Sequence, residues 1–481
     1  MLSYLKVLWK RRHFPPGPFP LPLVGSLWWI GIGLHPDSLV KLSKAYGNIY
    51  TIWVAHHPIV VLSGFQTVKE GLINHSEELV DRPLTHFLIR AFNKKGLAFG
   101  NGSTWKQHRR FGIVTMRNLG LGKTGMEYQI EEEAHRLVEA FSRAKGQPLD
   151  PSLLISNSVS SLINVVSFGY RFAPDDAKFR RMIAASDYFE RFSVSFYHAL
   201  YNLFPWLMKH LPGPHQKALS CMEMGISYAK EEVDKHRENQ NVHEPQDFID
   251  FYLLQMEKSK GDPNSTFNEE NLLQCILDLF VAGTETTSST LQWAVLLMVA
   301  YPDVQEKVYK EIEEVLGSSH TIRYEDRKKL PYTNAVIHEA QRAKYILPVG
   351  IPRRCSKDLN MLGFHIPKKT LVVTDLNSVL LDPKQWETPG EFNPNHFLDK
   401  EGNFVAREEF LPYGAGARVC LGEQMARMEL FIFFAHLLRA FRFQLPEGVK
   451  ELNKDPVVAI SMHPHPYKLC AVPRSTLCQI I

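Results

Sequence analysis

The chain has 481 residues, of which 44% are hydrophobic and 22% are charged, and its formal net charge is +4 at pH 7. This composition allows a large apolar core, and the slight positive charge excludes a general nucleic-acid-binding surface. The length corresponds to about two or three ordinary domains, or to one unit that a large cofactor organises. The widely spaced cysteines exclude zinc fingers and a disulfide scaffold and indicate a reducing compartment; they are Cys221, Cys275, Cys355, Cys420, Cys470 and Cys478.

The N-terminal segment has a short apolar stretch that ends in a basic cluster, Lys10-Arg-Arg12. Two interpretations of residues 1–13 stay open: the remnant of a truncated membrane anchor, or an amphipathic terminus. Residues 14–22 hold too many prolines for a helix or a central strand, so we expect a stiff extended connector. No window supplies the about 20 consecutive apolar residues that a membrane-spanning helix needs. We therefore expect residues 23–481 to form a single domain without such a helix.

The first regular element after the connector is a predicted hairpin from Ile49 to Ser63, with His57-Pro58 in its turn. From residue 102 onward helical patterns dominate. The clearest of these predicted helices cover 127–145, 151–168, 216–238, 247–258 and 421–440.

A proline-free, apolar-rich run between Pro263 and Pro302 predicts a very long central helix that begins with a capping box, Thr266-Phe-Asn-Glu269. At ~1.5 Å per residue this helix would span roughly 50 Å. Residues 350–376 alternate like short strands, and 382–412 are rich in turns. The predicted fold class is mainly α with a small β-rich lobe.

The segment Phe410-Leu-Pro-Tyr-Gly-Ala-Gly-Ala-Arg-Val-Cys420-Leu-Gly422 places one cysteine beside an arginine and ahead of a helix. Unpaired N–H groups in the first turn of that helix favour a thiolate. Gly416 and Gly422 would let the backbone approach the sulfur without a Cβ in between. A single sulfur ligand suits haem better than zinc or an iron–sulfur cluster. The alternative for Cys420 taken alone is a small buried hydrophobic residue.

This segment resembles the cysteine loop of the cytochrome P450 haem-thiolate monooxygenases, with Tyr413 where the family usually has phenylalanine. The resemblance implies haem b with Cys420 as the axial ligand to iron, held between the long central helix and the cysteine-loop helix. A second match is Ala282-Gly-Thr-Glu-Thr-Thr287 in the long helix, which resembles the family's oxygen-activation motif. It implies that Thr286 contacts the bound dioxygen and that Glu285 belongs to the proton-delivery path.

The residues of that second motif also support a plainer interpretation. A glycine and several threonines inside a helix predict local distortion, because hydroxyls compete for backbone carbonyls. The hexad alone is more typical of an ordinary buried helix whose hydroxyls bond to the preceding turn.

Glu339 and Arg342 stand three residues apart and so share one helical face. With His396 in Phe392-Asn-Pro-Asn-His-Phe they resemble the family's buried structural Glu–Arg pair, locked by a residue from the loop before the cysteine. His338-Glu339 also begins like a metalloprotease helix, but Arg342 stands where the second histidine would be needed, which excludes a zinc protease.

Trp105 and Arg109 lie at positions i and i+4 of a predicted helix, a spacing suited to gripping a carboxylate. By resemblance to the family, Trp105, Arg109, Arg353, Arg418 and Arg82 would hold the haem propionates. Gly120-Leu-Gly-Lys-Thr-Gly125 fits a dinucleotide fingerprint, but it follows a helix, so we interpret it as an inter-helix turn. NADPH and flavins would therefore act only through a partner reductase.

The resemblance runs from the proline-rich connector to Leu469-Cys-Ala-Val-Pro473 and points to the vertebrate-type microsomal family 2 branch, near the fatty-acid epoxygenases. It implies hydroxylation or epoxidation of lipophilic fatty acids, steroids or xenobiotics. It also implies an endoplasmic reticulum location on the cytoplasmic side and contact with the membrane surface. By position, the distal pocket would be lined by Thr85, Phe99, Ala282, Leu347, Ile351 and Ile460.

The electron donors implied are NADPH-cytochrome P450 reductase and a b-type cytochrome, on a basic face that includes Lys106, Arg109, Arg110 and Arg427. Phe204, Trp206 and Leu207 are candidates for membrane contact. Two other functions stay open: a haem-thiolate isomerase or dehydratase that acts on peroxides without a reductase, and a non-catalytic haem-binding protein. Glu285 and Thr286 argue against both.

Overall fold

The structure, a computed structural model, describes residues 2–30, 36–120, 124–173, 176–238, 244–317 and 321–474. The helices are α1 (Leu2–Arg11), α2 (Leu27–Ile30), α3 (Pro36–Tyr46), α4 (Phe65–Lys69), α5 (His86–Phe92), α6 (Gly102–Asn118), α7 (Thr124–Ser142), α8 (Ser152–Phe168), α9 (Ala177–Ser193), α10 (Phe196–Leu203), α11 (Pro205–Met208), α12 (Pro214–Glu238), α13 (Phe248–Lys258), α14 (Glu269–Ala300), α15 (Pro302–Leu316), α16 (Pro331–Ala343), α17 (Asn377–Leu380) and α18 (Glu423–Ala440).

The strands are short. They are β1 (Ile49–Val54), β2 (His57–Ser63), β3 (Pro148–Leu149), β4 (Arg353–Arg354), β5 (Leu359–Met361), β6 (Phe364–Ile366), β7 (Leu371–Asp375), β8 (Phe441–Gln444), β9 (Pro456–Val457), β10 (His463–Pro464) and β11 (Leu469–Pro473). Single helical turns occur at η1 (Glu70–Asn74), η2 (Tyr324–Lys328), η3 (Pro394–Phe397) and η4 (Gly416–Arg418).

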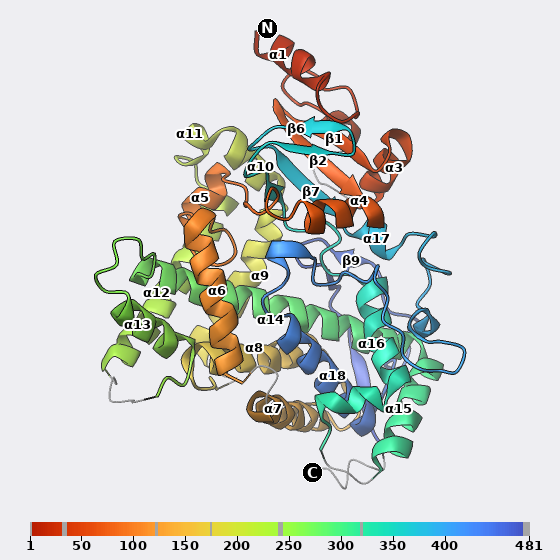
Figure 1. Cartoon of the computed structure of the whole chain (residues 1–481). Helices are drawn as coiled ribbons and strands as arrows, with labels where there is room; N and C mark the ends of the chain where they lie inside the picture. The colour runs from red at the N-terminus through yellow and green to blue at the C-terminus, as the bar shows by residue number, and fades with distance from the viewer. Residues whose placement is uncertain are drawn as a thin grey trace.

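The β-rich lobe lies at one end of the molecule, beside α1 and α3, and the helices fill the rest (Figure 1). Its main sheet has the strand order β1-β2-β7-β4, with β2 and β7 parallel and the other neighbours antiparallel. A second sheet, β3-β11-β8, brings the end of α18 back onto the helical body. The predicted class, mainly α with a small β-rich lobe, is confirmed.

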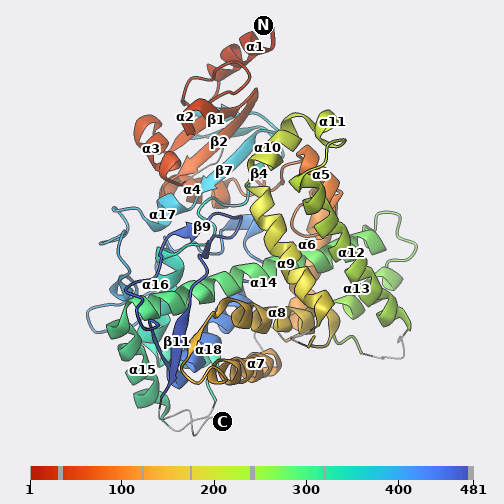
Figure 2. The same cartoon turned by 180° about the vertical axis from the view of Figure 1, so that it is seen from behind.

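The long helix α14 crosses the middle of the molecule, with α8 and α18 on one side of it (Figures 1 and 2). Residues 287–299 of α14 are buried without exception, as part of the main apolar core. Gly283 explains how α8 comes so close, because a Cβ there would lie 2.3 Å from Cδ1 of Ile163. The glycine in the predicted oxygen motif therefore serves helix packing.

Most predicted elements are present, with small shifts at their ends. The hairpin turn is formed by Ala55 and His56, so His57 and Pro58 already belong to β2. The predicted capping box is wrong: Asn268 caps α14 by accepting the N–H of Asn271, because Thr266 donates its hydroxyl to Gln107 instead. The local distortion predicted for α14 is also wrong, since the helix runs regularly from Glu269 to Ala300.

Within the described residues, no helix is both long and apolar enough to cross a membrane. The proline-rich segment 14–22 has no helix, as predicted. The described cysteines are free, and Cys478 lies outside the described residues. In the segment Gly120–Gly125, Gly120 follows α6, and Thr124 and Gly125 are the first two residues of α7; the middle, 121–123, lies outside the described part.

A buried charge network fixes α16 to the segment that leads to the cysteine loop. Arg342 donates to both carboxylate oxygens of Glu339, at 2.7 Å each, and neither side chain is accessible to solvent. His396 donates from Nδ1 to Glu339 at 3.1 Å, because its Nε2 accepts the backbone N–H of Thr388. The remaining N–H groups of Arg342 reach the carbonyls of Leu380, Pro389 and Glu391. The predicted contacts among Glu339, Arg342 and His396 are thus present.

We predict that Arg342→Met will lower the free energy of unfolding by about 3–5 kcal/mol, because it leaves the Glu339 carboxylate buried without its counter-charge. Urea unfolding followed by tryptophan fluorescence would measure the loss. Arg136→Met is the matched control, since Arg136 pairs with Glu132 on an exposed helix face and such pairs contribute little. Equal losses in the two variants would contradict the prediction.

Candidate functional site

The cysteine loop is held in place by one hydrogen bond within it and by two to other segments. The N–H of Cys420 donates to the Tyr413 carbonyl at 3.0 Å, and the Tyr413 hydroxyl accepts from Gln341 on α16. The N–H of Ala417 donates to the Ser76 hydroxyl at 2.7 Å. The loop is therefore tied to α16 and to the segment after η1, and it cannot shift without breaking several buried contacts.

Gly416 is the tightest point of this loop. Its φ is +74°, and a Cβ there would lie 1.8 Å from the carbonyl oxygen of Leu72. The close approach is therefore to Leu72 and not to the cysteine sulfur, which corrects the sequence interpretation. Gly422 has open space around its Cβ position and a negative φ, so the predicted need for glycine there is not seen.

Cys420 is exposed, whereas the other described cysteines are buried or half-buried. Its side chain is accessible to solvent, yet enough protein surrounds it for burial to raise the pKa of the thiol. The N–H groups of Gly422 and Glu423 and the charge of Arg109 lower that pKa, while the Glu423 carboxylate raises it. The predicted helix N-terminus is present, but these groups do not offset the effect of burial on the thiol pKa. Metal coordination is the remaining way to hold a thiolate there.

Four arginines converge beside the cysteine loop. Arg82, Arg353 and Arg418 are buried, and Arg109 is half-buried. Burial first, and then the charges of the other arginines, lower the pKa of Arg82 far below its usual value, that of Arg353 to about 10 and that of Arg418 to about 9. Such a cluster needs nearby anions to offset its repulsion.

Among the described residues, the two carboxylates whose charges act on Arg418 are already engaged with other partners. Asp81 is engaged with Arg354 at 3.0 Å, and Asp278 accepts the N–H groups of Leu97 and Ala98 at 2.7 and 2.9 Å. A cofactor that carries two carboxylates beside a single thiolate ligand matches this arrangement, and haem has that donor requirement. The residues present fit haem.

The arginines also bind the surrounding backbone together. Arg418 donates to the carbonyls of Val80, Leu97 and Gly100, and Arg82 donates to those of Ile351 and Pro352. The sequence predicted that Trp105 and Arg109 bind a carboxylate together. In the structure Trp105 stacks under Arg418, whose guanidinium lies 3.8 Å from the ring centroid. Arg109 instead donates to the Val419 carbonyl, directly before the cysteine.

The polar stretch of α14 lies close to this assembly. The Thr287 hydroxyl hydrogen-bonds Glu429 of α18, and the charge of Asp278 acts on Arg418. Thr286 donates its hydroxyl to the Ala282 carbonyl at 2.6 Å, as in the plainer interpretation of the motif. Ala282 is exposed although it lies in the middle of a largely buried helix, so this face of α14 borders open space.

Glu285 has an unusual environment. Burial, and then the charges of Glu190 and Asp187, raise the pKa of Glu285 to about 8, and only Arg191 acts in the opposite direction. Glu190 is itself buried, accepts the N–H of Ser461 at 3.1 Å, and has its pKa raised to about 7, mainly by burial. A carboxyl group with a pKa near 8 holds its proton at neutral pH.

Sequence reasoning missed Glu190 and Asp278. Glu190 lies on an amphipathic helix without a motif, and nothing near it in the sequence marks it as buried. Asp278 could have been found, because it is an isolated carboxylate within an apolar run, Cys275-Ile-Leu-Asp-Leu-Phe280. Buried charges in such runs are retained only with partners.

The six predicted pocket residues are all incompletely buried. Ala282 and Ile351 are exposed, and Thr85, Phe99, Leu347 and Ile460 are half-buried. Thr85 uses its hydroxyl to cap α5, where it accepts the N–H of Leu88 at 3.3 Å.

Comparison with known proteins tests the family. Residues 15–471 match the family model described as Cytochrome P450. The chain belongs to the cytochrome P450 family. Human cytochrome P450 2J2 is 42% identical over 465 residues, which cover 97% of this chain and 92% of the relative. Mouse cytochrome P450 2J5 is 43% identical over 475 residues, covering 98% and 94%, and human cytochrome P450 2D6 is 40% identical over 478 residues, covering 98% and 96%.

These similarities confirm the predicted branch, a microsomal family 2 cytochrome P450 near the 2J subfamily. As a member, the chain is a haem-thiolate monooxygenase that inserts one atom of dioxygen into lipophilic substrates with NADPH electrons from a reductase. The isomerase and non-catalytic alternatives are not favoured. Haem iron with a cysteine thiolate ligand is the cofactor of this cytochrome P450.

We predict that Gly416→Ala will prevent stable haem binding, because the added Cβ would collide with the Leu72 carbonyl. The Soret band of the reduced carbon monoxide complex, measured per mole of purified chain, would show the loss. Gly414→Ala is the matched control: Gly414 has a φ of +69° but nothing within 4 Å of its Cβ position, so the variant should lose only about 1–2 kcal/mol of stability and keep its haem. Full haem content in the Gly416 variant would contradict the prediction.

Proposed function

We propose that this cytochrome P450 oxidises a lipophilic, lipid-like substrate beside the cysteine loop and the polar stretch of α14. The single observation that supports it most is the exposed thiol of Cys420 beside four converging arginines. When bound, haem supplies dioxygen activation, and donation from the Cys420 thiolate promotes cleavage of the O–O bond. Cys420 would hold the iron, and Trp105, Arg82, Arg109, Arg353 and Arg418 would hold the propionates.

The substrate class follows from the pocket residues. Phe99, Ala282, Leu347, Ile351 and Ile460 offer apolar surface, and the Thr85 hydroxyl is committed to capping α5. A cleft of this kind recognises substrates by shape and apolar area, with few fixed polar contacts. A long-chain fatty acid or another lipophilic molecule fits these requirements.

Glu285 and Thr286 are proposed to move protons toward the bound dioxygen. Glu285 is protonated at neutral pH because burial and two neighbouring carboxylates raise its pKa to about 8. Thr286 follows it in α14, and its hydroxyl oxygen keeps a lone pair free to accept while it donates to Ala282. Glu285 would therefore be the proton donor, and the Thr286 hydroxyl would pass the proton on.

Electrons are proposed to enter over the exposed face of α6. A groove of about 430 Å³ lies there, lined by Trp105, Lys106, Arg110, Val114, Arg117 and Ala417 among others. Of the predicted basic face, Lys106 and Arg110 are exposed, whereas Arg109 donates to the Val419 carbonyl and Arg427 pairs with Glu423. Arg117 is a further exposed arginine of this groove, and Lys106 lies 3.1 Å from Glu77. A basic patch beside the thiolate would steer the acidic surface of NADPH-cytochrome P450 reductase or of a b-type cytochrome.

Attachment to the endoplasmic reticulum membrane, on its cytoplasmic side, is proposed through exposed apolar side chains. Phe204, Trp206 and Leu207 are exposed at α11, with Trp206 67% accessible. In both views α11 lies toward the same end of the molecule as α1 and the β-rich lobe (Figures 1 and 2). Aromatic and aliphatic side chains at one end suit insertion into the interfacial layer.

Reconstitution of the purified protein with reductase tests the proposed reaction. We expect oxygenated products of a polyunsaturated fatty acid that require NADPH and reductase, and none from Cys420→Ala, which also loses the Soret band of the reduced carbon monoxide complex. Rearrangement of a fatty-acid hydroperoxide without reductase would instead support the isomerase function. Absence of fatty-acid products together with oxidation of other lipophilic compounds would overturn the substrate class alone.

We predict that coupling, the product formed per NADPH consumed, falls as the pH rises through about 8, because Glu285 then loses the proton that it donates. Glu285→Gln should give low coupling at every pH and remove this titration. Thr286→Val should divert NADPH to peroxide, whereas Thr290→Val, one turn further along and bonded back in the same way to Thr286, should not. A flat pH profile of coupling in the unsubstituted enzyme would rule out the role of Glu285.

A further inference from the structure

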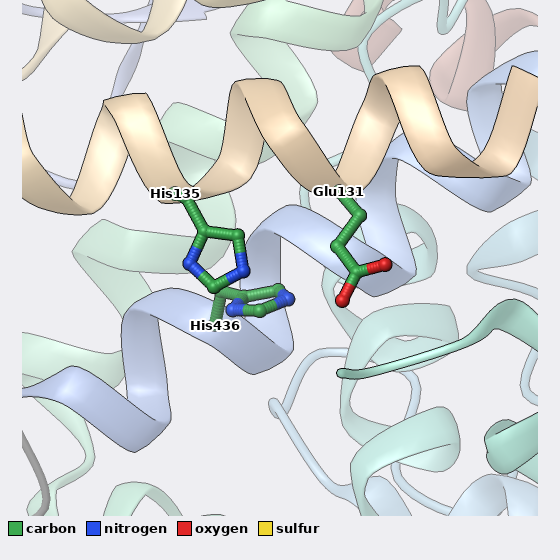
Figure 3. Close-up of side chains that lie close together, drawn as sticks. All are labelled: Glu131, His135 and His436. Atoms are coloured by element: carbon green, nitrogen blue, oxygen red, sulfur yellow. The ribbon is translucent and has the colours of Figure 1, made fainter. Parts of the chain in front are cut away.

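A cluster of three metal-ligand side chains lies between α7 and α18, on a part of the molecule that the reaction does not use. Glu131 and His135 stand at i and i+4 on α7 and so share one helix face. Both point toward His436 of α18, whose ring lies between them (Figure 3). One ligand atom from each residue lies within 4.8 Å of the others.

His436 is the residue that calls for an explanation. It is only 2% exposed, and its Nε2 has no hydrogen-bond partner. Leaving a buried polar atom unpaired costs roughly 1–3 kcal/mol, so such atoms are uncommon in folded proteins. Its ring packs at 66° against that of His135, with 4.7 Å between centroids. Burial, followed by the charges of His135 and Arg439, lowers the pKa of His436 to about 3, so the ring is neutral and has a lone pair.

We propose that Glu131, His135 and His436 bind a divalent transition-metal ion, and that Zn²⁺ is the ion best suited to them. Two imidazole nitrogens and one carboxylate oxygen, with water in the fourth position, are a donor set that Zn²⁺ takes in proteins. Ligand atoms at ~2.1 Å from a tetrahedral ion lie about 3.4 Å apart. Because the ligand atoms lie within 4.8 Å of one another, they need to approach by at most about 1.4 Å, and the half-buried Glu131 and His135 side chains are the ones that would rotate.

The groups around the cluster are compatible with a cation. Glu131 accepts hydrogen bonds from the Thr321 side chain and the Ile322 N–H, which is the support that a ligating carboxylate usually has. Arg323 and Glu127 act on Glu131 with opposite charges. Arg439, one turn beyond His436, directs its guanidinium to Glu313 at 3.1 Å. The positive charge of Arg323 is therefore balanced by Glu127, and that of Arg439 is directed toward Glu313.

The other described cluster of this type, His236 with Asp247 and Asp250, differs in one decisive respect. His236 uses both ring nitrogens, Nδ1 toward the Glu232 carbonyl at 2.7 Å and Nε2 toward Asp247 at 3.0 Å. It is a satisfied ion pair with no unpartnered ligand atom, so it serves as an internal control.

An ion at the proposed site would join α7 to the helix that begins directly after the cysteine loop, since α18 starts at Glu423. A ligand that binds only the folded state stabilises it by an amount that grows with the logarithm of the ratio of ligand concentration to dissociation constant. Zn²⁺ should therefore raise the melting temperature of the haem-loaded protein. Mg²⁺ should not, because it prefers oxygen ligands.

The test uses haem-loaded protein that has been treated with a chelator and then equilibrated with buffered Zn²⁺. Bound zinc is measured by mass spectrometry, and melting is followed through the Soret band. We expect the unsubstituted protein to hold a single Zn²⁺ ion that His135→Gln and Glu131→Gln lose, whereas His236→Gln keeps it. Since even outer-shell partners contribute about 10–100-fold to metal affinity, loss of a direct ligand should weaken binding by more than about 100-fold.

His135 and Glu131 are half-buried, so both variants should fold and keep their haem. His436→Asn is a further variant, whose haem content reports on folding before its zinc is measured. Equal zinc affinity in the unsubstituted, His135→Gln and Glu131→Gln proteins would overturn the proposal. So would the absence of any zinc-dependent rise in melting temperature in the unsubstituted protein.

Discussion

The carboxylate of Glu339 is the charge on which the cysteine side of the molecule depends. A carboxylate without solvent contact must be neutralised and hydrogen-bonded, and Arg342, His396 and the N–H of Asn393 do both. Because Arg342 also holds three carbonyls of the following segment, the irregular chain ahead of the cysteine loop is fixed to one face of α16. Gln341, the residue before Arg342, donates to the Tyr413 hydroxyl and so connects α16 directly to the cysteine loop.

A second chain of contacts links the long helix to the same place. Asp278 on α14 orients the N–H groups of Leu97 and Ala98, and the carbonyl groups of that segment accept from Arg418. This chain of contacts therefore runs from a buried carboxylate, through a backbone segment that it holds, to a buried arginine beside the cysteine. Each member is desolvated, so each stabilises the orientation of the next, and the cofactor site is preorganised by the apoprotein's own charges.

Structural features that depend on consecutive residues could be predicted from the sequence, whereas contacts between segments far apart in the sequence could not. Glycine and proline positions marked the cysteine loop and the two ends of α14, because they act locally on the backbone. The cap at Asn268 was missed because Gln107, far away in sequence, takes the hydroxyl of Thr266. Two further contacts depend on which segments pack together: Trp105 stacks under Arg418, and Glu131 lies close to His436. The spacing of residues in the sequence does not indicate which segments pack together.

The contact between Gly283 and Ile163 has a consequence for how this enzyme could change over evolution. The space that a side chain at position 283 would need is already taken by a side chain of α8. A larger residue at 283 is therefore tolerated only after Ile163 has become smaller, so the two positions are epistatic and the order of substitution matters. Since residue 283 neighbours the exposed Ala282, variation at the exposed side of this stretch of α14 is limited by the packing of Gly283 against α8.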